Sequence, residues 1–451
     1  MRRTLFSLLA TISLACGTSS ERATFEPPAP PIVPPEETPP LGTEPGKSCT
    51  GLRCDVPSCP AGQTTAIEGD TWDPAGNTKL YNVLTYVPNA PLEPFTTTAT
   101  CDRCGKVSGD PIATALSNEA GHFRLEGVPA GKNIPLVLQV GKWRRTITVP
   151  IVEPCTTTNL SPKAARLPGK RSEGDMPRIA VVTGSFDELG CLLRRIGVAD
   201  EEYTSAPNEG RIHIYRGVGG GDLSTAKAPL ATELWSSKAK LANYDAVMLA
   251  CEGWEHDETK DWGYNKTPAD KQALHDYLAT GGRVFATHYH YAWFKKSPAE
   301  DFRNIATWNE PASAYGHHEL TVDTSFPKGA AFANWLVNVG ATSTPGKLEV
   351  DNIGANVASV NPSVAQRWLY GEKGVVYTSF NTPIGVPEED KCGRAVLTDI
   401  HVSGEQGSKH LPNACATTEL TPQEKALEFF FFDLTACVQP DAKKPEAPMP
   451  K

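Results

Sequence analysis

Side chains that can do chemistry end three runs of apolar residues in the second half of the chain. They are Cys251 and Glu252 at the first run, His288 and His290 at the second, and Asp399 and His401 at the third. If these runs are strands of one parallel sheet, their carboxyl ends meet at the edge where such sheets bind ligands. The sequence therefore predicts one polar cluster there, suited to metal binding or to nucleophilic chemistry.

One interpretation of this cluster is a metal site. His288 and His290 stand two residues apart, a spacing that places both on one face of a strand. With His401 they would supply three imidazoles, and Glu252 or Asp399 would add a carboxylate, a set that suits zinc or a similar ion. Because such an ion activates water, this interpretation predicts a secreted, metal-dependent hydrolase.

Two further interpretations remain open. In one, His401 is the general base for Cys251 as a nucleophile, with Glu252 as a third candidate catalytic residue. In the other, stacked histidines and the aromatic side chains of residues 289–293 fill a vestigial pocket that binds a ligand without chemistry. From the sequence we expect this binding module first and keep the hydrolase as the alternative.

The elements that must position these residues alternate between strands and helices. Predicted strands cover residues 179–184, 211–215, 244–251, 283–287, 375–379 and 395–400, and predicted helices cover 188–196, 268–279 and 421–434. The alternation indicates an α/β domain over residues 174–438 with a mainly parallel sheet.

Two other motifs in this domain have simpler explanations. His317-His318 precedes an alternating segment and is more typical of a strand entrance than of a metal site. The glycine-rich segment 217–221 lacks the lysine and hydroxyl residue of a phosphate loop and the strand-to-helix context of a dinucleotide fingerprint. We expect it to be a flexible loop.

The first half of the chain has a β pattern. Short apolar or alternating runs cover residues 64–68, 81–87, 111–116, 121–125, 134–140 and 142–149. Turn residues separate these runs at intervals typical of a β-sandwich. We therefore expect a multidomain chain in which a β-sandwich, residues 48–160, precedes the α/β domain.

Eleven cysteines besides Cys16 fall into two groups. The first is Cys49, Cys54, Cys59, Cys101, Cys104 and Cys155, and the second is Cys191, Cys251, Cys392, Cys415 and Cys437. In an exported chain they indicate structural disulfides, and the six in the first group allow fifteen pairings. In the second group, Cys392 and Cys415 are a plausible pair. Cys191 and Cys437 lie on the first and last helices, which leaves Cys251 unpaired.

The N-terminus carries an export signal. Arg2 and Arg3 precede an apolar segment, residues 5–14, which is too short to span a membrane, and residues 12–16, Ile-Ser-Leu-Ala-Cys, resemble a lipobox. We expect residues 1–15 to be a lipoprotein signal peptide, Cys16 to be lipidated, and the proline-rich residues 16–47 to form an extended tether. The lipid anchor makes the membrane a partner.

Composition narrows the remaining choices. The formal net charge of -9 and the lack of a basic stripe argue against nucleic acid as a partner. After the signal segment, no apolar run approaches the roughly 18 residues that a membrane-spanning helix needs. The Pro/Lys/Ala-rich residues 439–451 predict a disordered tail.

Two segments of the β region resemble a known family. Residues 121–131, Gly-His-Phe-Arg-Leu-Glu-Gly-Val-Pro-Ala-Gly, resemble the signature of carboxypeptidase regulatory-like, transthyretin-like domains, and residues 84–90, Leu-Thr-Tyr-Val-Pro-Asn-Ala, resemble a strand of the same family. The resemblance implies a non-catalytic module, and some related folds bind carbohydrate. An insertion that carries Cys101 and Cys104 departs from the family pattern.

The α/β region resembles a second family. The order of its strand ends, Cys-Glu-Gly at 251–253, His-Tyr-His at 288–290 and Asp-Ile-His at 399–401, resembles class I glutamine amidotransferase-like, flavodoxin-like folds, including the ThuA-like branch. The resemblance places His288 near the family's nucleophilic cysteine and His401 at its histidine position. The G-x-C-x-G elbow is absent here, which puts the amidotransferase reaction in doubt.

Over residues 49–438 the chain as a whole resembles a lipoprotein family from myxobacteria-like Gram-negative bacteria, as in the stretches 141–145, 323–329 and 398–403. We therefore expect an outer-membrane lipoprotein, on the periplasmic face or at the cell surface, that binds a glycan or another envelope component. Zinc is the cofactor that the alternative function would require.

Overall fold

The computed structural model describes residues 49–105, 107–256, 264–310, 313–402, 410–416 and 419–450. Residues Cys49–Lys451 form one compact unit. The expected signal peptide, the lipidation site Cys16 and the tether lie outside the described residues. Across the described ranges, every helix is too short or too polar to cross a membrane.

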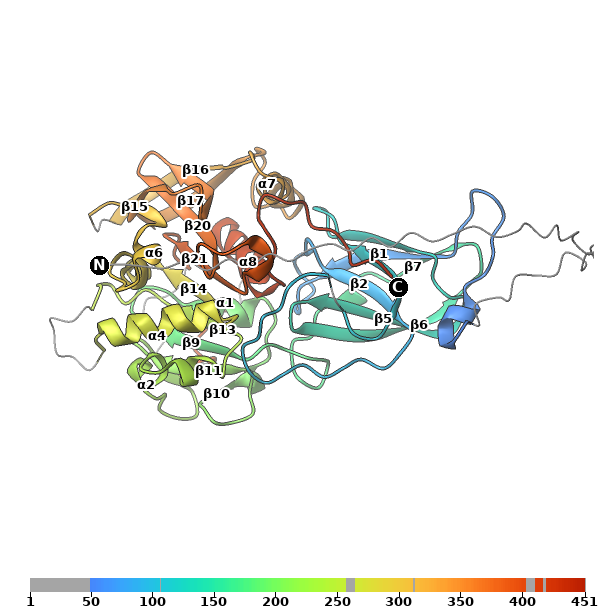
Figure 1. The fold of residues 1–451 in the computed structure, drawn as a ribbon, viewed down its shortest axis with the longest axis horizontal. Helices are drawn as coiled ribbons and strands as arrows, with labels where there is room; N and C mark the ends of the chain where they lie inside the picture. Colours follow the sequence, from blue (N-terminus) through green and yellow to red (C-terminus); the bar gives the residue numbers. More distant parts are fainter. Residues whose placement is uncertain are drawn as a thin grey trace, which may run out of the picture. The chain divides into compact units, whose positions relative to one another are not determined.

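Two four-stranded sheets make up the first part of this unit (Figure 1). The first sheet consists of β1 (Ala66–Trp72), β4 (His122–Glu126), β7 (Thr157–Asn159) and β8 (Ala165–Arg166). The second consists of β2 (Leu84–Pro88), β3 (Pro111–Leu116), β5 (Gly131–Val140) and β6 (Trp143–Val152), and a short 3₁₀ helix, η1 (Gly51–Asp55), precedes both sheets. Ile67, Leu125 and Leu136 from these strands are fully buried in one core. All six strands predicted from the apolar runs are present, with bounds shifted by a few residues.

A larger sheet follows in the order β10-β11-β9-β13-β14-β21-β20-β19-β16-β17. Its parallel part consists of β9 (Ile179–Thr183), β10 (Tyr203–Thr204), β11 (Ile212–Arg216), β13 (Ala246–Leu249), β14 (Arg283–Thr287) and β21 (Gly393–Thr398). The antiparallel part consists of β15 (Ala306–Trp308), β16 (Ser313–Val322), β17 (Lys347–Gly354), β18 (Val357–Val360), β19 (Ala365–Gly371) and β20 (Gly374–Thr382).

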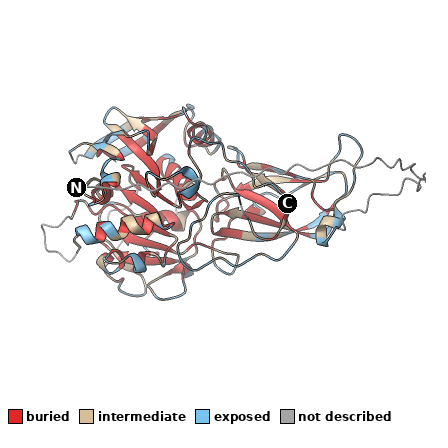
Figure 2. Cartoon of the chain, in the orientation of Figure 1, coloured by how far each residue is buried: buried red, intermediate tan, exposed pale blue. Residues whose placement is uncertain are grey.

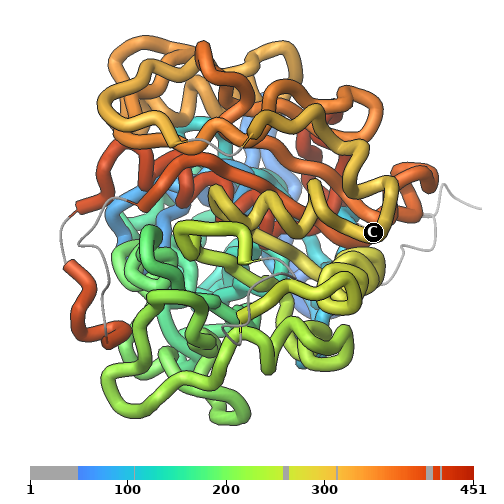
Figure 3. Tube along the Cα trace, turned by 90° about the vertical axis from the view of Figure 1, so that its left-hand side faces the viewer, coloured from blue at the N-terminus to red at the C-terminus, as the bar shows by residue number. Residues whose placement is uncertain are grey.

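The prediction of a mainly parallel sheet is therefore wrong for the second half of this sheet, although the α/β class is correct. The antiparallel strands lie toward one edge, coloured yellow to orange at the top of Figures 1 and 3. A separate two-stranded ladder joins β12 (Asp222–Leu223) to β22 (His410–Leu411).

Helices cover both faces of the parallel strands, which explains their nearly continuous apolar sequences. The α-helices are α1 (Leu189–Arg195), α2 (Ala231–Trp235), α3 (Lys238–Leu241), α4 (Pro268–Ala279), α5 (Ala292–Lys295), α6 (Glu300–Arg303), α7 (Pro327–Asn338) and α8 (Pro422–Thr435). The other 3₁₀ helices are η2 (Asp200–Glu202), η3 (His288–Tyr291) and η4 (Glu388–Asp390). Alternate residues of β9 point to opposite faces: Val181 packs in the core that includes α1 and α8, and Val182 packs in the core that includes α2 and α4.

Helix α8 joins the two parts of the unit. Its Phe431 and Phe432 make edge contacts with Trp143 of β6, and its Phe430 stacks on Tyr377 of β20 at 3.5 Å. Segments coloured as buried in Figure 2 accordingly lie in both parts. One continuous core therefore holds the small sheets against the helical layer of the large sheet.

Five disulfides add covalent links: Cys49–Cys54, Cys59–Cys155, Cys101–Cys392, Cys104–Cys437 and Cys191–Cys415. Cys251 is free, as expected. The predicted pairs Cys392–Cys415 and Cys191–Cys437 are wrong, because the prediction treated the two groups of cysteines as closed sets. Cys101 and Cys104, in the connection between β2 and β3, instead pair with cysteines of the second group.

The predicted disorder of residues 439–451 is also wrong for its described part. Asp441 is buried and lies 2.9 Å from Arg394 and 3.3 Å from Lys328. Further along, the carbonyl of Pro448 accepts a hydrogen bond from Thr114 of β3. A buried ion pair thus fixes a segment whose composition alone suggested no packing.

Candidate metal centre

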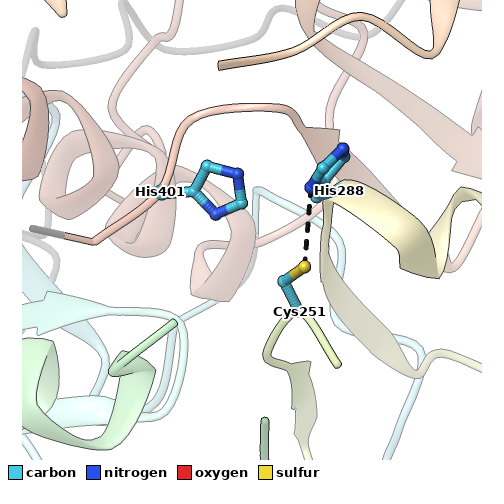
Figure 4. Close-up of side chains that lie close together, drawn as sticks. All are labelled: Cys251, His288 and His401. Atoms are coloured by element: carbon cyan, nitrogen blue, oxygen red, sulfur yellow. Dashed lines mark hydrogen bonds between the residues drawn. The ribbon is translucent and has the colours of Figure 1, made fainter. Parts of the chain in front are cut away.

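Three side chains from three neighbouring strand ends converge in the large sheet (Figure 4). Cys251 follows β13, His288 follows β14 and His401 follows β21. One ligand atom from each lies within 4.8 Å of the other two, and the Cys251 Sγ atom is 3.5 Å from the His288 Nδ1 atom. The rings of His288 and His401 meet edge to face at 4.9 Å. The predicted polar cluster therefore exists at the predicted edge of the sheet.

His290 does not belong to this cluster. The spacing argument assumed an extended strand, but β14 ends at Thr287 and the chain turns at once into η3, with His288 in the left-handed region at φ 42°. His290 therefore points elsewhere: its Nε2 atom is 2.9 Å from the carbonyl of Ala250, and its Nδ1 atom accepts from Trp293. Burial lowers the pKa of His290 to about 4. The structure therefore does not bring the predicted set His288, His290 and His401 together; Cys251 takes the place of His290 beside the other two histidines.

Glu252 lies behind the cluster instead of in it. Its carboxylate accepts from the ammonium of Lys266 at 2.5 Å and from the backbone N–H of Val218 at 3.0 Å, and the side chains of Glu252 and Lys266 are shielded from solvent. The glycine-rich segment is part of this packing, since a Cβ atom at Gly217 would lie 2.5 Å from Glu252. Glu252 is therefore a structural anchor, and neither its predicted catalytic role nor its metal role has a geometric basis.

Asp399 also turns away from the cluster. Asn356 donates to both of its carboxylate oxygens, through its backbone N–H at 2.9 Å and its side-chain amide at 2.8 Å. Burial raises the pKa of Asp399 to about 6. Gly354 makes this packing possible, because a Cβ atom there would lie 2.7 Å from Asp399 and 2.5 Å from His288.

Asp187 is a site residue that the sequence analysis missed. Its Oδ1 atom is 2.9 Å from Nδ1 of His401, and its Oδ2 atom accepts from the hydroxyl of Thr287 at 2.5 Å and from the backbone N–H of Cys251 at 3.1 Å. Asp187 follows β9 within the loop Ser185-Phe-Asp187. The rule that located the other residues, polar side chains after parallel strands, would also have located this one.

The charges in the site follow from these contacts. Burial alone would raise the pKa of the Asp187 carboxyl. The nearby His401 and the hydrogen bonds lower it by more, so the pKa is below its ordinary value. Burial opposes the charged form of His401, but Asp187 outweighs it, and the pKa of His401 is raised. Burial and the Asp187 carboxylate both raise the pKa of the Cys251 thiol. Without a cation, Cys251 is therefore held as a thiol.

A cavity of about 450 Å³ opens over the cluster, within the range of small-ligand sites. Cys251, His288 and His401 contribute to its floor, and the other sides come from residues of the β9 and β13 loops and of β16 and β17. Of the aromatic residues expected to fill the pocket, Tyr289 lines it, whereas Tyr291 and Trp293 are fully buried elsewhere. His317 and His318 lie within β16, as the strand prediction requires.

The cluster fits a tetrahedral zinc site. Zn–S and Zn–N bonds of about 2.3 and 2.0–2.1 Å at the tetrahedral angle place the two donor atoms about 3.6 Å apart, close to the 3.5 Å between Cys251 and His288. Asp187 engages Nδ1 of His401 and leaves Nε2 for a metal, an orientation that carboxylate partners commonly impose on zinc-bound histidines. Three protein ligands beside a cavity are the arrangement of catalytic zinc sites, which keep one position open.

Comparisons with known proteins identify no family. No family model matches the chain, and no curated protein matches it. A ThuA-like protein from Bacteroides uniformis is 10% identical with a TM-score of 0.26, and the match covers 57% of this chain and 90% of that one. PurLQS from Thermotoga maritima is 11% identical with a TM-score of 0.27, covering 57% and 99%.

A cohesin–X-dockerin complex mutant from Acetivibrio cellulolyticus is 12% identical with a TM-score of 0.16, covering 33% of this chain and 79% of that one. Likenesses this weak carry no argument about activity. The α/β class of the second part follows from its own strand order and helical layers.

Proposed function

We propose that this chain is an exported, zinc-dependent hydrolase whose metal is held by Cys251, His288 and His401. The observation that carries the proposal is the convergence of three ligand atoms, within 4.8 Å of one another, on the floor of a cavity. A zinc ion in an open site lowers the pKa of bound water to about 7 and polarises a carbonyl oxygen. Asp187 would hold His401 in the tautomer that presents Nε2 to the metal.

The cysteine-nucleophile interpretation finds less support. Reactive cysteines need a lowered thiol pKa, whereas burial and Asp187 raise that of Cys251. The backbone N–H of Cys251, which could have served an oxyanion, already donates to Asp187. The contact between Nδ1 of His401 and Asp187 does not separate the two interpretations, because it leaves Nε2 for either a metal or a proton. A cation at the cluster would favour the thiolate form of Cys251, and the proposed zinc ion is such a cation.

Export is the second part of the proposal. Five disulfides among the described residues are typical of an oxidising compartment and support export. The signal peptide and the lipid anchor at Cys16 are part of this proposal and rest on the sequence pattern alone. We further propose that residues 48–160 are a carboxypeptidase regulatory-like β-sandwich and that residues 174–438 belong to the ThuA-like, amidotransferase-like folds. The left-handed turn of His288 between β14 and η3, at the position expected for that family's nucleophile, supports the second assignment.

A binding protein without chemistry remains the second candidate, because the cavity has an apolar side that would suit a ligand in the absence of any metal. Zinc analysis and an activity assay on the full exported chain separate the two candidates. We expect one zinc per chain and a zinc-dependent hydrolysis of p-nitrophenyl acetate, both lost in His401→Ala and retained in the matched surface variant His122→Ala. A metal-free, folded protein without esterase activity would contradict the hydrolase and leave the binding protein.

A further inference from the structure

The exposed aromatic side chains of the described chain gather at one place. Phe186, Trp254 and Tyr315 are 48%, 52% and 82% exposed, and no other phenylalanine, tryptophan or tyrosine in the described ranges is exposed to this degree. Phe186 and Tyr315 line the cavity over the metal centre, as does the half-buried Tyr289. The ring of Trp254 lies 6.0 Å from that of Tyr289. We call these four side chains the aromatic rim.

The backbone is shaped to hold this rim. Gly253, between Cys251 and Trp254, has φ 78°, and a Cβ atom there would lie 2.3 Å from the ring of Phe186. The glycine therefore lets Phe186 approach the backbone of the metal-binding loop. Tyr315 comes from β16, so aromatic side chains from two separate parts of the sheet line the cavity. Exposed apolar area concentrated in this way marks a binding surface.

The polar groups of the cavity point to an uncharged ligand. Beyond the candidate metal centre and the tyrosines, its described lining contains no lysine or arginine, and its hydrogen-bonding side chains are Ser313, Asp351, Asn352 and Gln423. Carboxylate, sulfate and phosphate groups would therefore find no cation except the metal. A cationic ligand is disfavoured by the positive charge of a zinc ion on the floor.

A ligand with an apolar face and a hydroxyl-bearing edge matches both features. A pyranose ring has C–H groups on its faces, which pack on aromatic rings, and hydroxyl groups at its edge, which both donate and accept hydrogen bonds. Asp351 and Asn352 of β17 offer hydrogen-bonding groups for that edge. One Asp351 oxygen is 3.1 Å from His317, and the Asn352 amide oxygen accepts from the backbone N–H of Gly316, so the second Asp351 oxygen and the Asn352 amide N–H groups are the ones left for a ligand. A peptide of mixed side chains would not need so many hydrogen-bonding groups along one edge of the cavity.

We infer that the aromatic rim binds an uncharged saccharide and presents an acyl group on it, ester or amide, to the metal centre. The inference rests on the proposed zinc function and names its substrate class. In the reaction, the oxygen of a water molecule forms a bond to the acyl carbon, and the bond from that carbon to the sugar oxygen or nitrogen breaks. A zinc ion held by Cys251, His288 and His401 would supply the activation of this water. One proton of the water passes to the leaving sugar atom, so that a carboxylic acid and a free hydroxyl or amine result without any redox step.

The test uses the full exported chain loaded with zinc and two probes, acetylated xylotetraose for the ester and N-acetylchitotetraose for the amide. We expect calorimetry to detect binding of at least one probe and mass spectrometry to detect release of acetate from it. Removal of one stacking ring, in Trp254→Ala or Tyr315→Ala, should weaken binding about tenfold. The matched variant Ile151→Ala removes an equally exposed apolar side chain far along β6 and should bind as the wild type does.

The outcomes separate the two levels of the proposal. If zinc binds and p-nitrophenyl acetate is hydrolysed but neither saccharide binds, the substrate class is wrong and the zinc function stands. If a saccharide binds through the rim but no zinc is present, the zinc function is wrong. Binding that survives in the double variant Trp254→Ala/Tyr315→Ala would overturn the role of the rim even if acetate is released.

Discussion

Two buried clusters of ionisable groups in this protein differ in what surrounds them. In the tail cluster, Arg394 lies 2.8 Å from Asp433 and 2.9 Å from Asp441, and Lys328 lies 2.7 Å from Asp433. Two cations thus balance two anions, and all four side chains are buried. Because the charges are balanced, the cluster is electrically complete and in that sense closed. It holds the C-terminal segment against β20 and α8.

The metal centre is open by contrast. Asp187 alone carries the negative charge, and it receives hydrogen bonds from His401, Thr287 and the backbone of Cys251. Cys251, His288 and His401 direct their remaining donor atoms toward one another beside a cavity. Buried ionisable groups whose charges cancel hold the fold, whereas donor atoms that converge beside a cavity are candidates for metal binding.

The largest predicted effect concerns the closed cluster. Asp441→Ala leaves Arg394 and Lys328 with an uncompensated buried charge, so we expect the free energy of unfolding to fall by about 3–5 kcal/mol. Urea denaturation measures this change, and the exposed Glu389→Ala is the control. Zinc content should not change. A loss of zinc in the folded Asp441→Ala protein would show that the two clusters are not separate.

A third buried cluster, which contains mainly carboxyl groups, extends the comparison, because its contribution to stability should depend on pH. Asp73 and Glu428 are buried together. Burial raises the pKa of Asp73 from its ordinary 3.8 to about 6. Burial also raises the pKa of Glu428 above its ordinary value, and the nearby Lys425 offsets part of that rise. Because both pKa values are raised in the folded state, folding favours the protonated carboxyl groups. Their contribution to the free energy of unfolding is therefore complete below about pH 4 and is lost as the pH rises through about 6. For Asp73 the loss is about 3 kcal/mol.

Glu428→Gln should reduce this loss, so its stability relative to wild type should increase between pH 4 and pH 7. Urea titrations at several pH values measure the difference, and the exposed Glu419→Gln should show a constant one. A constant difference for Glu428→Gln would mean that the pKa of Glu428 is not raised in the folded protein.

The smallest of these effects tests the open cluster. Asp187→Asn keeps the size of the side chain but removes the charge that orients His401, and we expect zinc to bind about 10- to 100-fold more weakly. Competition with a chromophoric chelator gives the affinity. Asp399→Asn, which changes a nearby carboxyl that faces Asn356, is the matched control and should keep its zinc. Equal affinities in wild type and Asp187→Asn would remove Asp187 from the centre.

The strand and helix positions were predictable where local signals agree. Helix α4 was predicted with its observed bounds, because Thr267 caps it, Pro268 starts it and Gly281 follows it. The parallel strands were predictable from their apolar runs. The antiparallel strands β16 to β19 were not, because their alternating sequences mix polar and apolar residues and their partners lie far along the chain.

The site was predictable as a place and only partly as a set of residues. Strand ends located Cys251, His288 and His401, but the spacing of His288 and His290 was interpreted as strand although the backbone turns after Thr287. The disulfides Cys101–Cys392 and Cys104–Cys437 span 291 and 333 residues, a separation at which the sequence gives no local signal. Local geometry and long-range pairing are the two kinds of information that residue spacing does not carry.

Cobalt substitution tests the metal centre most directly. Co²⁺ takes the place of zinc in such sites and shows a thiolate-to-cobalt charge-transfer band in the near ultraviolet when a cysteine is a ligand. We predict one cobalt per chain with this band, which disappears in Cys251→Ser while tetrahedral absorption in the visible persists or weakens. A wild-type protein that binds no cobalt, or a band that Cys251→Ser leaves unchanged, would contradict the centre formed by Cys251, His288 and His401.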